Sequence, residues 1–282
     1  MSGILYLVAT PIGNLEDMTY RAVRILSEVD LIAAEDTRNS IRLLNHFEIK
    51  TPMTSYHEFN KYDKAKVLVD KLLEGKNIAV ITDAGTPGIS DPGEELVKQS
   101  LEAGITVTSV PGACAAVSAL ITSGLPTRRF AFEAFLPHDK KEKARILEEL
   151  KEETRTIIIY EAPHRLKKTL AELFDVLGDR KITLTRELTK KHETIEQTIF
   201  SQAISYYEEN EPRGEYVIVI AGMDAAAIQA EQRAEYEAMT VEEHVAMYLE
   251  QGMPKKEAIR QAATDRGVPK RDIYNVVERK ER

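Results

Sequence analysis

The chain has 282 residues, of which 43% are hydrophobic and 30% are charged. This length and apolar content allow one large domain or two ordinary domains with substantial hydrophobic cores. The formal net charge of −8 argues against a general nucleic-acid-binding protein, although a local basic surface on an acidic protein can still hold RNA.

A single cysteine, Cys114, rules out a disulfide framework and a multi-cysteine metal site. Its neighbours are small and apolar, so we expect a packed thiol rather than a nucleophile. No histidine spacing such as H-x-x-x-H supports a metal site. No basic segment precedes the first apolar run, and no apolar stretch reaches the length that spans a membrane. We therefore predict a soluble, cytoplasmic protein with no metal and no membrane association.

Apolar, β-branched runs and amphipathic segments alternate along the first 122 residues. The predicted strands cover residues 4–9, 31–34, 78–81 and 105–110. The predicted helices cover residues 19–29, 65–73 and 113–121, and two more pass through Ile41 and Leu96. This alternation indicates a mainly parallel sheet with right-handed crossovers.

The pattern changes after a linker at residues 123–127. Further strands are predicted at residues 130–135, 155–160, 182–185, 194–200 and 216–221, and further helices at 139–153 and 166–177. We interpret residues 1–122 as an N-terminal α/β domain that carries the ligand loops. Residues 123–222 form a second, more antiparallel α/β domain that closes a cleft, and residues 223–282 form a C-terminal extension.

The C-terminal extension is expected to begin with an acidic, alanine-rich helical linker. A capping box at residues 240–243 starts the next helix, and two short helices follow at 255–263 and 270–277. From Gly252 onward there are nine Lys and Arg against five Asp and Glu, so this piece is basic. It forms either a helix-turn-helix that helps to capture RNA, or a three-helix cap or dimer contact.

The most informative stretch runs from Ile78 to Gly93. Its apolar strand stops at Thr82 and Asp83, and a loop with three glycines and two prolines follows. Asp91 is expected to cap the next helix and Glu94 to complete a capping box. Asp83 offers a carboxylate for a ribose hydroxyl, an amine or a cation.

Three other predicted strands end in similarly unusual residues, at 11–14, 35–38 and 111–113. The carboxyl ends of parallel strands lie along one edge, so the four loops can line a single crevice. Neither G-x-G-x-x-G after the first strand nor G-x-x-x-x-G-K-[ST] is present. The ligand is therefore expected to be nucleotide-like but not anchored by phosphates.

These four loops resemble the motifs of the tetrapyrrole-methylase superfamily, and within it the branch that methylates small-subunit ribosomal RNA. The resemblance continues through residues 160–165, 186–190 and 214–216 and covers nearly the whole chain to Gly222. It implies two α/β domains of the class III methyltransferase type, with S-adenosylmethionine in the cleft between them. It also implies a homodimer and 2′-O-methylation of a cytidine in 16S rRNA of the small ribosomal subunit.

The resemblance also implies site residues. The expected cofactor contacts are Pro11, Gly13, Asp83, Ala84, Gly85, Pro87, Ser90, Pro111, Gly112, Ala113 and Ala162. The expected catalytic residues are Glu35, Asp36, Arg38 and Glu187. Candidates for the proton acceptor are Glu35, Asp36, His57, Glu161 and Glu187, while acidic residues beside an arginine can equally be structural ion pairs.

The expected RNA contacts are Arg38, His57, Asn60, His164, Arg165, Arg186 and Lys190, together with the neighbouring Lys191. Tyr56 and Phe59 can stack on unpaired bases, or they can be buried.

The first loop reads Thr-Pro-Ile-Gly-Asn, whereas the tetrapyrrole enzymes usually carry a G-x-G-P-G-D-type loop. This departure favours the RNA branch. Two alternatives stay open: a precorrin-type tetrapyrrole methyltransferase, and a non-catalytic RNA-binding module that senses a nucleotide.

Overall fold

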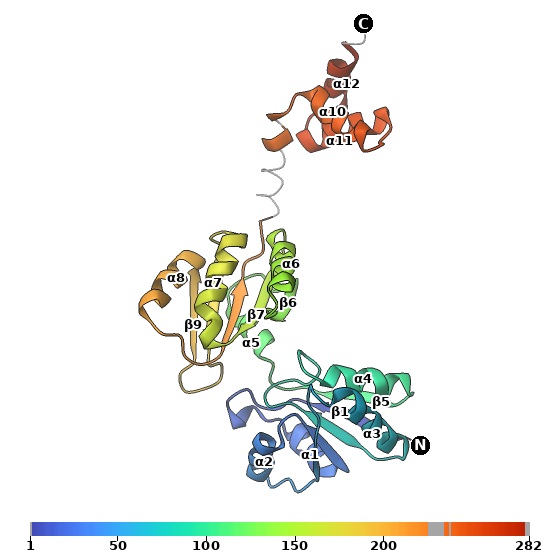
Figure 1. Cartoon of the computed structure of the whole chain (residues 1–282), viewed down its shortest axis with the longest axis vertical. Coiled ribbons are helices and arrows are strands. Elements are labelled where there is room, and N and C mark those ends of the chain that lie inside the picture. The colour runs from blue at the N-terminus through green and yellow to red at the C-terminus, as the bar shows by residue number, and fades with distance from the viewer. Residues whose placement is uncertain (1, 225–233, 237, 280–282) are drawn as a thin grey trace. The chain divides into compact units, whose positions relative to one another are not determined.

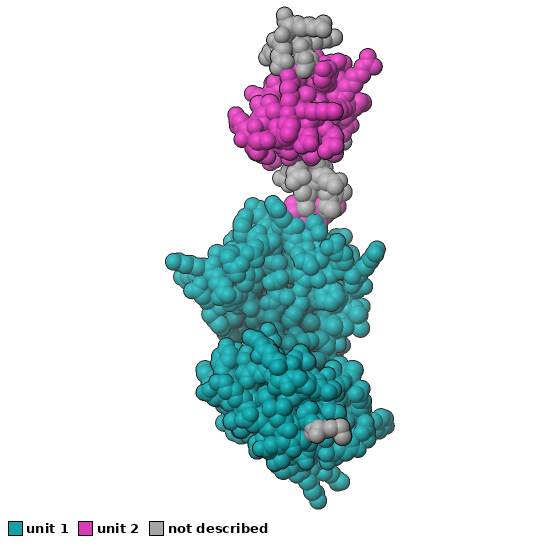
Figure 2. All heavy atoms as spheres, turned by 90° about the vertical axis from the view of Figure 1, so that its right-hand side faces the viewer, with its two compact units in different colours: residues 1–221 teal, residues 222–282 magenta. Residues whose placement is uncertain are grey.

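The computed structural model describes residues 2–224, 234–236 and 238–279. The chain divides into two compact units, Met1–Ala221 and Gly222–Arg282, which Figure 2 colours teal and magenta. Each unit is described by itself.

A five-stranded sheet forms the first half of the larger unit, and all of its pairings are parallel. Its order is β3 (Met53–Ser55), β2 (Leu31–Ala34), β4 (Ile78–Ile81), β1 (Ile4–Val8) and β5 (Thr106–Val110). All four residues of β4 are buried, as expected for a central strand covered on both faces. The predicted parallel sheet is confirmed, although the three-residue β3 was too short to be predicted.

Helices cover both faces of this sheet (Figure 1). Helices α1 (Tyr20–Glu28) and α2 (Thr37–His46) pack on one face, and α3 (Lys61–Leu73) and α4 (Gly93–Glu102) pack on the other. A short 3-10 helix, η1 (Leu15–Asp17), lies between β1 and α1. This arrangement leaves the carboxyl edge of the sheet to the loops.

The expected capping box at the start of α4 is wrong. The N-cap of α4 is Pro92, which has no side-chain acceptor. The Asp91 carboxylate instead accepts hydrogen bonds from the N–H groups of Gly88 (2.8 Å), Ile89 (3.1 Å) and Gly93 (2.7 Å). Asp91 therefore folds the loop before the helix as well as holding its first turn.

The second sheet is mixed, as predicted. Its order is β6 (Phe130–Phe135), β7 (Thr156–Glu161), β10 (Tyr216–Ile220), β8 (Lys181–Arg186) and β9 (Thr194–Ile199). Only the β6–β7 pairing is parallel.

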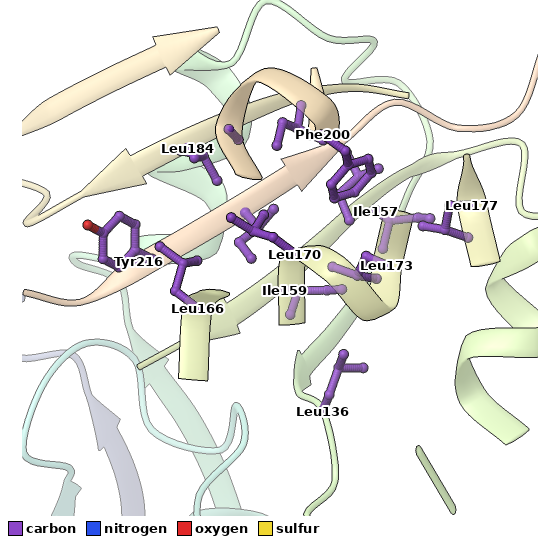
Figure 3. Packing of buried hydrophobic residues seen from close by; sticks show 14 of the residues in the cluster. Leu136, Ile157, Ile159, Leu166, Leu170, Leu173, Leu177, Leu184, Phe200 and Tyr216 are labelled. Atoms are coloured by element: carbon purple, nitrogen blue, oxygen red, sulfur yellow. The ribbon is translucent and has the colours of Figure 1, made fainter. Parts of the chain in front are cut away.

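One face of the second sheet is covered by α6 (Lys140–Lys151), α7 (Pro163–Leu177) and α8 (Phe200–Glu209). Figure 3 shows Leu166, Leu170 and Leu173 of α7 packed over the strand residues of this core. The opposite face is covered by α5 (Ala115–Thr122), whose Ala116, Ala119 and Leu120 pack against β7 and β10. The chain therefore crosses from the first sheet to the second through α5, and the division at residue 122 stays a prediction.

The smaller unit contains α10 (Val241–Glu250), α11 (Lys255–Arg266) and α12 (Lys270–Arg279). The predicted capping box of α10 is confirmed between Thr240 and Glu243. A core that includes Val245, Ile259 and Ile273 joins the three helices. The predicted helical linker falls mostly on residues 225–233, which lie outside the described residues.

A buried histidine, His244, lies in this smaller unit. Its Nδ1 accepts a hydrogen bond from Arg266 Nε at 3.1 Å, and its Nε2 lies 3.5 Å from an Asp265 oxygen. Burial, followed by the charge of Arg266, lowers the pKa of His244. The imidazole is therefore neutral at physiological pH.

Across the residues that the structure describes, no helix is both long enough and apolar enough to cross a membrane. Nor do those residues contain a group of three or more His, Cys, Asp or Glu side chains placed to hold a metal ion.

Candidate active site

A cavity of about 270 Å³ lies between the loops at the carboxyl edge of the first sheet and one end of the second sheet. From the first half, its lining residues are Ile12, Ala84, Gly85, Thr86, Ile89, Cys114 and Ala115. From the second half, they are Phe135, Tyr160, Glu161, Ala162, Thr185, Leu188, Lys190, Glu215, Tyr216 and Val217. Both halves of the larger unit therefore build its wall.

Hydrogen bonds fix three of the first-sheet loops to one another. The Thr10 N–H donates to the Gly85 carbonyl (2.9 Å), and the Gly85 N–H donates to the Thr10 carbonyl (3.1 Å). The Thr86 hydroxyl donates to the carbonyl of Ala113 at 2.9 Å. Gly85 has a φ of +83°, and a Cβ there would lie 3.3 Å from Ile12 Cγ2. A glycine is needed at this point because other residues are strained at that φ.

Asp83 does not line the cavity, although it follows β4 directly. Its Oδ1 accepts the Asp36 N–H and its Oδ2 accepts the Asn39 side-chain amide, both at 3.3 Å. Asp83 thus ties the end of β4 to the start of α2. Pro87 is buried in the same loop, and Ser90 is exposed with a φ of +63°.

The predicted catalytic residues after β2 lie at this edge but do not line the cavity. Asp36 is the N-cap of α2, and its side chain accepts hydrogen bonds from the backbone N–H and the guanidinium of Arg38. These bonds lower the pKa of Asp36 to about 2. Burial, followed by the charge of Asp83, raises the pKa of Glu35. Glu35 is therefore a stronger base than Asp36.

Glu187, Lys190 and Glu215 form a bonded cluster at the cavity wall. Lys190 Nζ donates to Glu187 Oε1 (2.9 Å) and to Glu215 Oε2 (2.8 Å), and the Glu215 N–H donates to Glu187 Oε1 at 3.0 Å. That backbone bond is the main reason that the pKa of Glu187 is lowered. Burial lowers the pKa of Lys190, but its bonds to the two carboxylates outweigh burial and raise it.

The Lys190 side chain also covers Gly13 in the loop after β1. A Cβ at Gly13 would lie 2.4 Å from Lys190 Cγ. Gly13 is therefore a contact point between the two halves of the unit, and its expected contact with the cofactor stays a prediction. Lys190 is held in an ion-pair network, and its expected contact with RNA stays a prediction.

Tyr160 joins the two halves in a second place. Its hydroxyl accepts the N–H of Ala116 in the first turn of α5 at 3.0 Å. The N-cap of α5 is Cys114, whose side chain makes no capping bond. Burial, followed by the proximity of Cys114, raises the pKa of Tyr160 to about 12. Tyr160 therefore stays protonated while it orients the helix that carries Cys114 and Ala115 in the cavity wall.

Glu161, a candidate proton acceptor, is buried and occupied by structural bonds. It accepts the Thr169 hydroxyl at 2.6 Å and lies 3.3 Å from Arg165 Nε. Arg165 also donates to the Leu136 carbonyl at 2.6 Å. The Glu161–Arg165 pair therefore lies inside the second half, and Glu161 also contributes to the cavity wall.

The remaining predicted RNA residues lie apart from the cavity lining. His57 donates its N–H to Asn60 Oδ1 at 2.9 Å, and His164 is exposed near the start of α7. Arg186 lies near the His192 carbonyl at 3.5 Å. Phe59 is 97% exposed, while Tyr56 is buried and donates its hydroxyl to the Pro92 carbonyl at 2.8 Å.

Of the predicted cofactor residues, Ala84, Gly85 and Ala162 line the cavity. Pro11, Pro111, Gly112 and Ala113 lie in adjoining loop positions without lining it. Thr86, Tyr160 and Glu215 also line the cavity and were not among the expected site residues, although Thr86 belongs to one of the four loops expected to line a crevice. The sequence contains one indication of a contact such as that of Tyr160. A helix capped by Cys114 lacks a polar N-cap side chain, so its first N–H groups need a hydrogen-bond acceptor from elsewhere in the chain.

Comparison with known proteins gives two kinds of match. The family model for Tetrapyrrole (Corrin/Porphyrin) Methylases matches residues 4–203. The ribosomal RNA small subunit methyltransferase I of Halalkalibacterium halodurans is 50% identical, over 97% of this chain and 94% of the relative. The protein of the same name from Bacillus subtilis is also 50% identical, over 97% and 93%.

Solved structures show the same fold. Uroporphyrin-III-C-methyltransferase from Thermus thermophilus aligns with a TM-score of 0.55 and 21% identity, over 78% of this chain and 94% of that one. Diphthine synthase aligns with a TM-score of 0.62 and 11% identity, over 78% and 90%. A structure of the Thermus thermophilus enzyme complexed with S-adenyl homocysteine has a TM-score of 0.52, 18% identity and coverage of 78% and 92%. The chain belongs to the tetrapyrrole methylase family, in the group of ribosomal RNA small subunit methyltransferases I.

Proposed function

We propose that this protein is a methyltransferase that uses S-adenosylmethionine to methylate the ribose 2′-hydroxyl of a cytidine in 16S rRNA of the small ribosomal subunit. The cavity carries the proposal, because both halves of the unit build it at the edge where open α/β sheets bind ligands. Relatives that are 50% identical over nearly the whole chain support the rRNA substrate.

The residues of the cavity fit the cofactor. Its volume of about 270 Å³ is close to the lower end of the ~300–1,000 Å³ of small-molecule sites. Ala84, Gly85 and Ala162 leave room for a flat ring beside the backbone, while Ile12 and Leu188 supply apolar surface. When bound, S-adenosylmethionine supplies a sulfonium methyl group that is already activated for transfer.

The chain must then align a hydroxyl with that methyl group and help to remove a proton from a weakly acidic alcohol. Among the four predicted catalytic residues, Glu35 is the one best suited to accept the proton, because burial raises its pKa. Asp36, with a pKa of about 2, is suited to hold Arg38 in place. We assign Arg38 to the RNA phosphates, since 88% of its side chain is exposed.

Glu187 is suited to a positioning role. Its carboxylate binds Lys190 and the backbone of Glu215, so it shapes the wall beside the cavity. We also propose that the protein acts as a homodimer in the cytoplasm, as the resemblance of its motifs implies.

Methyl transfer from radiolabelled S-adenosylmethionine tests the proposal. Small ribosomal subunits, naked 16S rRNA and a precorrin are offered separately, and labelled RNA is then digested to nucleosides. We expect label in 2′-O-methylcytidine. Label in a base-methylated nucleoside refutes the reaction, and label only in the precorrin favours the tetrapyrrole alternative. No label in any substrate supports the non-catalytic RNA-binding module.

The placement of the cofactor is tested by calorimetry on Ala162→Leu, whose larger side chain fills part of the cavity. We expect weaker binding of S-adenosylmethionine than in Ala246→Leu, a matched change at an exposed position of α10. Equal affinities in the two variants mean that the cofactor binds elsewhere.

A further inference from the structure

Helix α12 presents a polar face that the core of the smaller unit does not use. Ile273 is the buried residue of this helix, and Val277 is packed against the same core. Arg271, Tyr274 and Asn275 follow the i, i+3, i+4 spacing that brings side chains onto one helix face, and all three are exposed. The face they form lies away from Ile273.

The side chains of this face are available to a partner. Among the described residues, no ion pair or side-chain hydrogen bond involves Arg271, Tyr274 or Asn275. Tyr274 is 49% exposed, although burying an aromatic ring is favourable. Lys270, which opens the helix, is exposed as well.

The helices beside α12 are charged differently. The exposed cations Lys256 and Arg260 lie one turn apart on α11. The acidic residues Glu243 and Glu250 belong to α10. On α12 itself, Asp272 is exposed at a position outside the i, i+3, i+4 set, while Glu278 follows Arg271 at i+7 in the sequence. The positive charge of this unit is therefore concentrated on the α11–α12 pair.

We propose that the face formed by Arg271, Tyr274 and Asn275, the α12 face, binds RNA. The observations fit RNA better than a protein: a guanidinium can bind a phosphate, an exposed tyrosine ring can stack on an unpaired base, and an amide can bond a base edge. A homodimer contact would be expected to show apolar side chains at the centre of the patch, and this face has a cation and an amide beside one aromatic ring. The inference rests on the proposed function, because it gives the rRNA substrate a second binding surface.

The connection between α11 and α12 has the short length and the glycine that are typical of a helix-turn-helix. The turn between α11 and α12 contains Gly267 at a φ of +63°, the left-handed conformation that ends a helix. The turn exposes Val268 and leads directly to Lys270 and Arg271. In nucleic-acid-binding helix-turn-helix proteins, the helix that follows such a turn contacts the nucleic acid.

The test uses the full chain with the double change Arg271→Glu and Tyr274→Ala. Binding to a fluorescein-labelled 16S rRNA fragment is measured by anisotropy at two salt concentrations, and S-adenosylmethionine binding by calorimetry. The matched control is Lys98→Glu with Tyr206→Ala, since Lys98 is an exposed cation without an ion pair in the described structure and Tyr206 is 51% exposed.

We expect the α12 variant to bind RNA roughly tenfold more weakly than the control, because one stacked base and one phosphate contact are lost. Its salt dependence should also be shallower, and its cofactor affinity unchanged. RNA affinity equal to that of the control overturns the inference, as does a loss of dimer mass by light scattering with unchanged RNA affinity. If the double variant does not fold, Arg271→Gln alone is measured. We then expect a smaller loss of RNA affinity and of salt dependence, and RNA affinity equal to that of wild type overturns the inference.

This experiment separates the inference from the proposed function. If wild-type protein methylates rRNA and the α12 variant binds RNA as well as the control does, only the proposal that the α12 face binds RNA is refuted. Wild-type protein that binds RNA through this face but transfers no methyl group refutes only the proposed reaction.

Discussion

Replacing Lys190 by Met tests how much the ion pairs of the Glu187–Lys190–Glu215 cluster stabilise the larger unit. Methionine keeps most of the apolar length that packs over Gly13 but removes the ammonium group and both of its bonds. The Glu187 carboxylate retains the N–H of Glu215. The substitution therefore isolates the charge of Lys190 from the rest of the contact.

The expected loss is about 1–2 kcal/mol in the free energy of unfolding. The bond from Lys190 to Glu187 joins partly buried groups, with side-chain exposures of 30% and 23%. A charge-assisted bond in such a place contributes ~1–2 kcal/mol. The bond to Glu215 contributes little, because 80% of that side chain is exposed and surface pairs are worth about 0–1 kcal/mol.

Urea unfolding at neutral pH measures the loss. The matched control is Lys167→Met, which removes a surface ion pair of similar length, 2.7 Å to Glu211, with side-chain exposures of 40% and 79%. The control should lose less than ~0.5 kcal/mol. Equal losses in Lys190→Met and Lys167→Met would show that the cluster is an ordinary surface pair.

The pH dependence gives a second check on the same variant. The pKa of Glu187 is lowered in the folded protein from the usual 4.5. A carboxylate of this kind stabilises the fold above its unfolded pKa, and the contribution disappears as pH falls through the lower, folded pKa. The difference between wild type and Lys190→Met should therefore persist from neutral pH to about 4.5 and vanish at more acidic pH. A difference that grows toward acidic pH contradicts the assignment.

Three further changes test separate features. Tyr160→Phe leaves a buried N–H of α5 without its acceptor and should cost ~1–3 kcal/mol in urea unfolding; no loss would mean that water replaces the hydroxyl. Gly85→Ala should lose ~1–2 kcal/mol from backbone strain and also weaken cofactor binding, whereas Gly178→Ala has a similar φ and open space around it and should show the strain alone. Because the pKa of His244 is lowered by burial and by Arg266, the smaller unit should lose stability as pH falls below about 6.5. Hydrogen exchange in that unit should show this loss of stability at acidic pH in wild type and not in His244→Asn. Exchange protection that does not change with pH in wild type would refute the role of His244.

The sheets could be predicted because their strands carry strong local signals. The run Ile78–Ile81 is apolar and β-branched, and it became the fully buried central strand. The second sheet was also predicted as more antiparallel, and it is. Helix α8 was missed even though Phe200, Ala203 and Tyr207 have helical spacing and are buried. The predicted strand at 194–200 includes the first residue of this helix, and no element was predicted for residues 201–209.

The candidate site was predictable on one side only. The loops after β1, β4 and β5 could be predicted because glycine and proline interrupt the apolar pattern there. Of their residues, Ala84 and Gly85 line the cavity. The contacts that close the other side join residues far apart in the chain, such as Gly13 with Lys190 and Ala116 with Tyr160. No spacing in the sequence encodes these pairs, because they depend on how the second sheet packs against α5.

The distribution of charge explains why the two substrates need different surfaces. The charged residues of the cavity wall are Glu161, Lys190 and Glu215, and all three are engaged in bonds within the larger unit. The remaining wall is made of small and apolar side chains and backbone, so selection of the cofactor depends on shape and on backbone groups. An RNA strand needs exposed cations and aromatic faces, and the cavity has few of either to spare. The proposed function therefore places RNA recognition outside the cavity, at surfaces that carry exposed groups such as Arg38 and Phe59 in the larger unit and, by the further inference, Arg271 and Tyr274 in the smaller one.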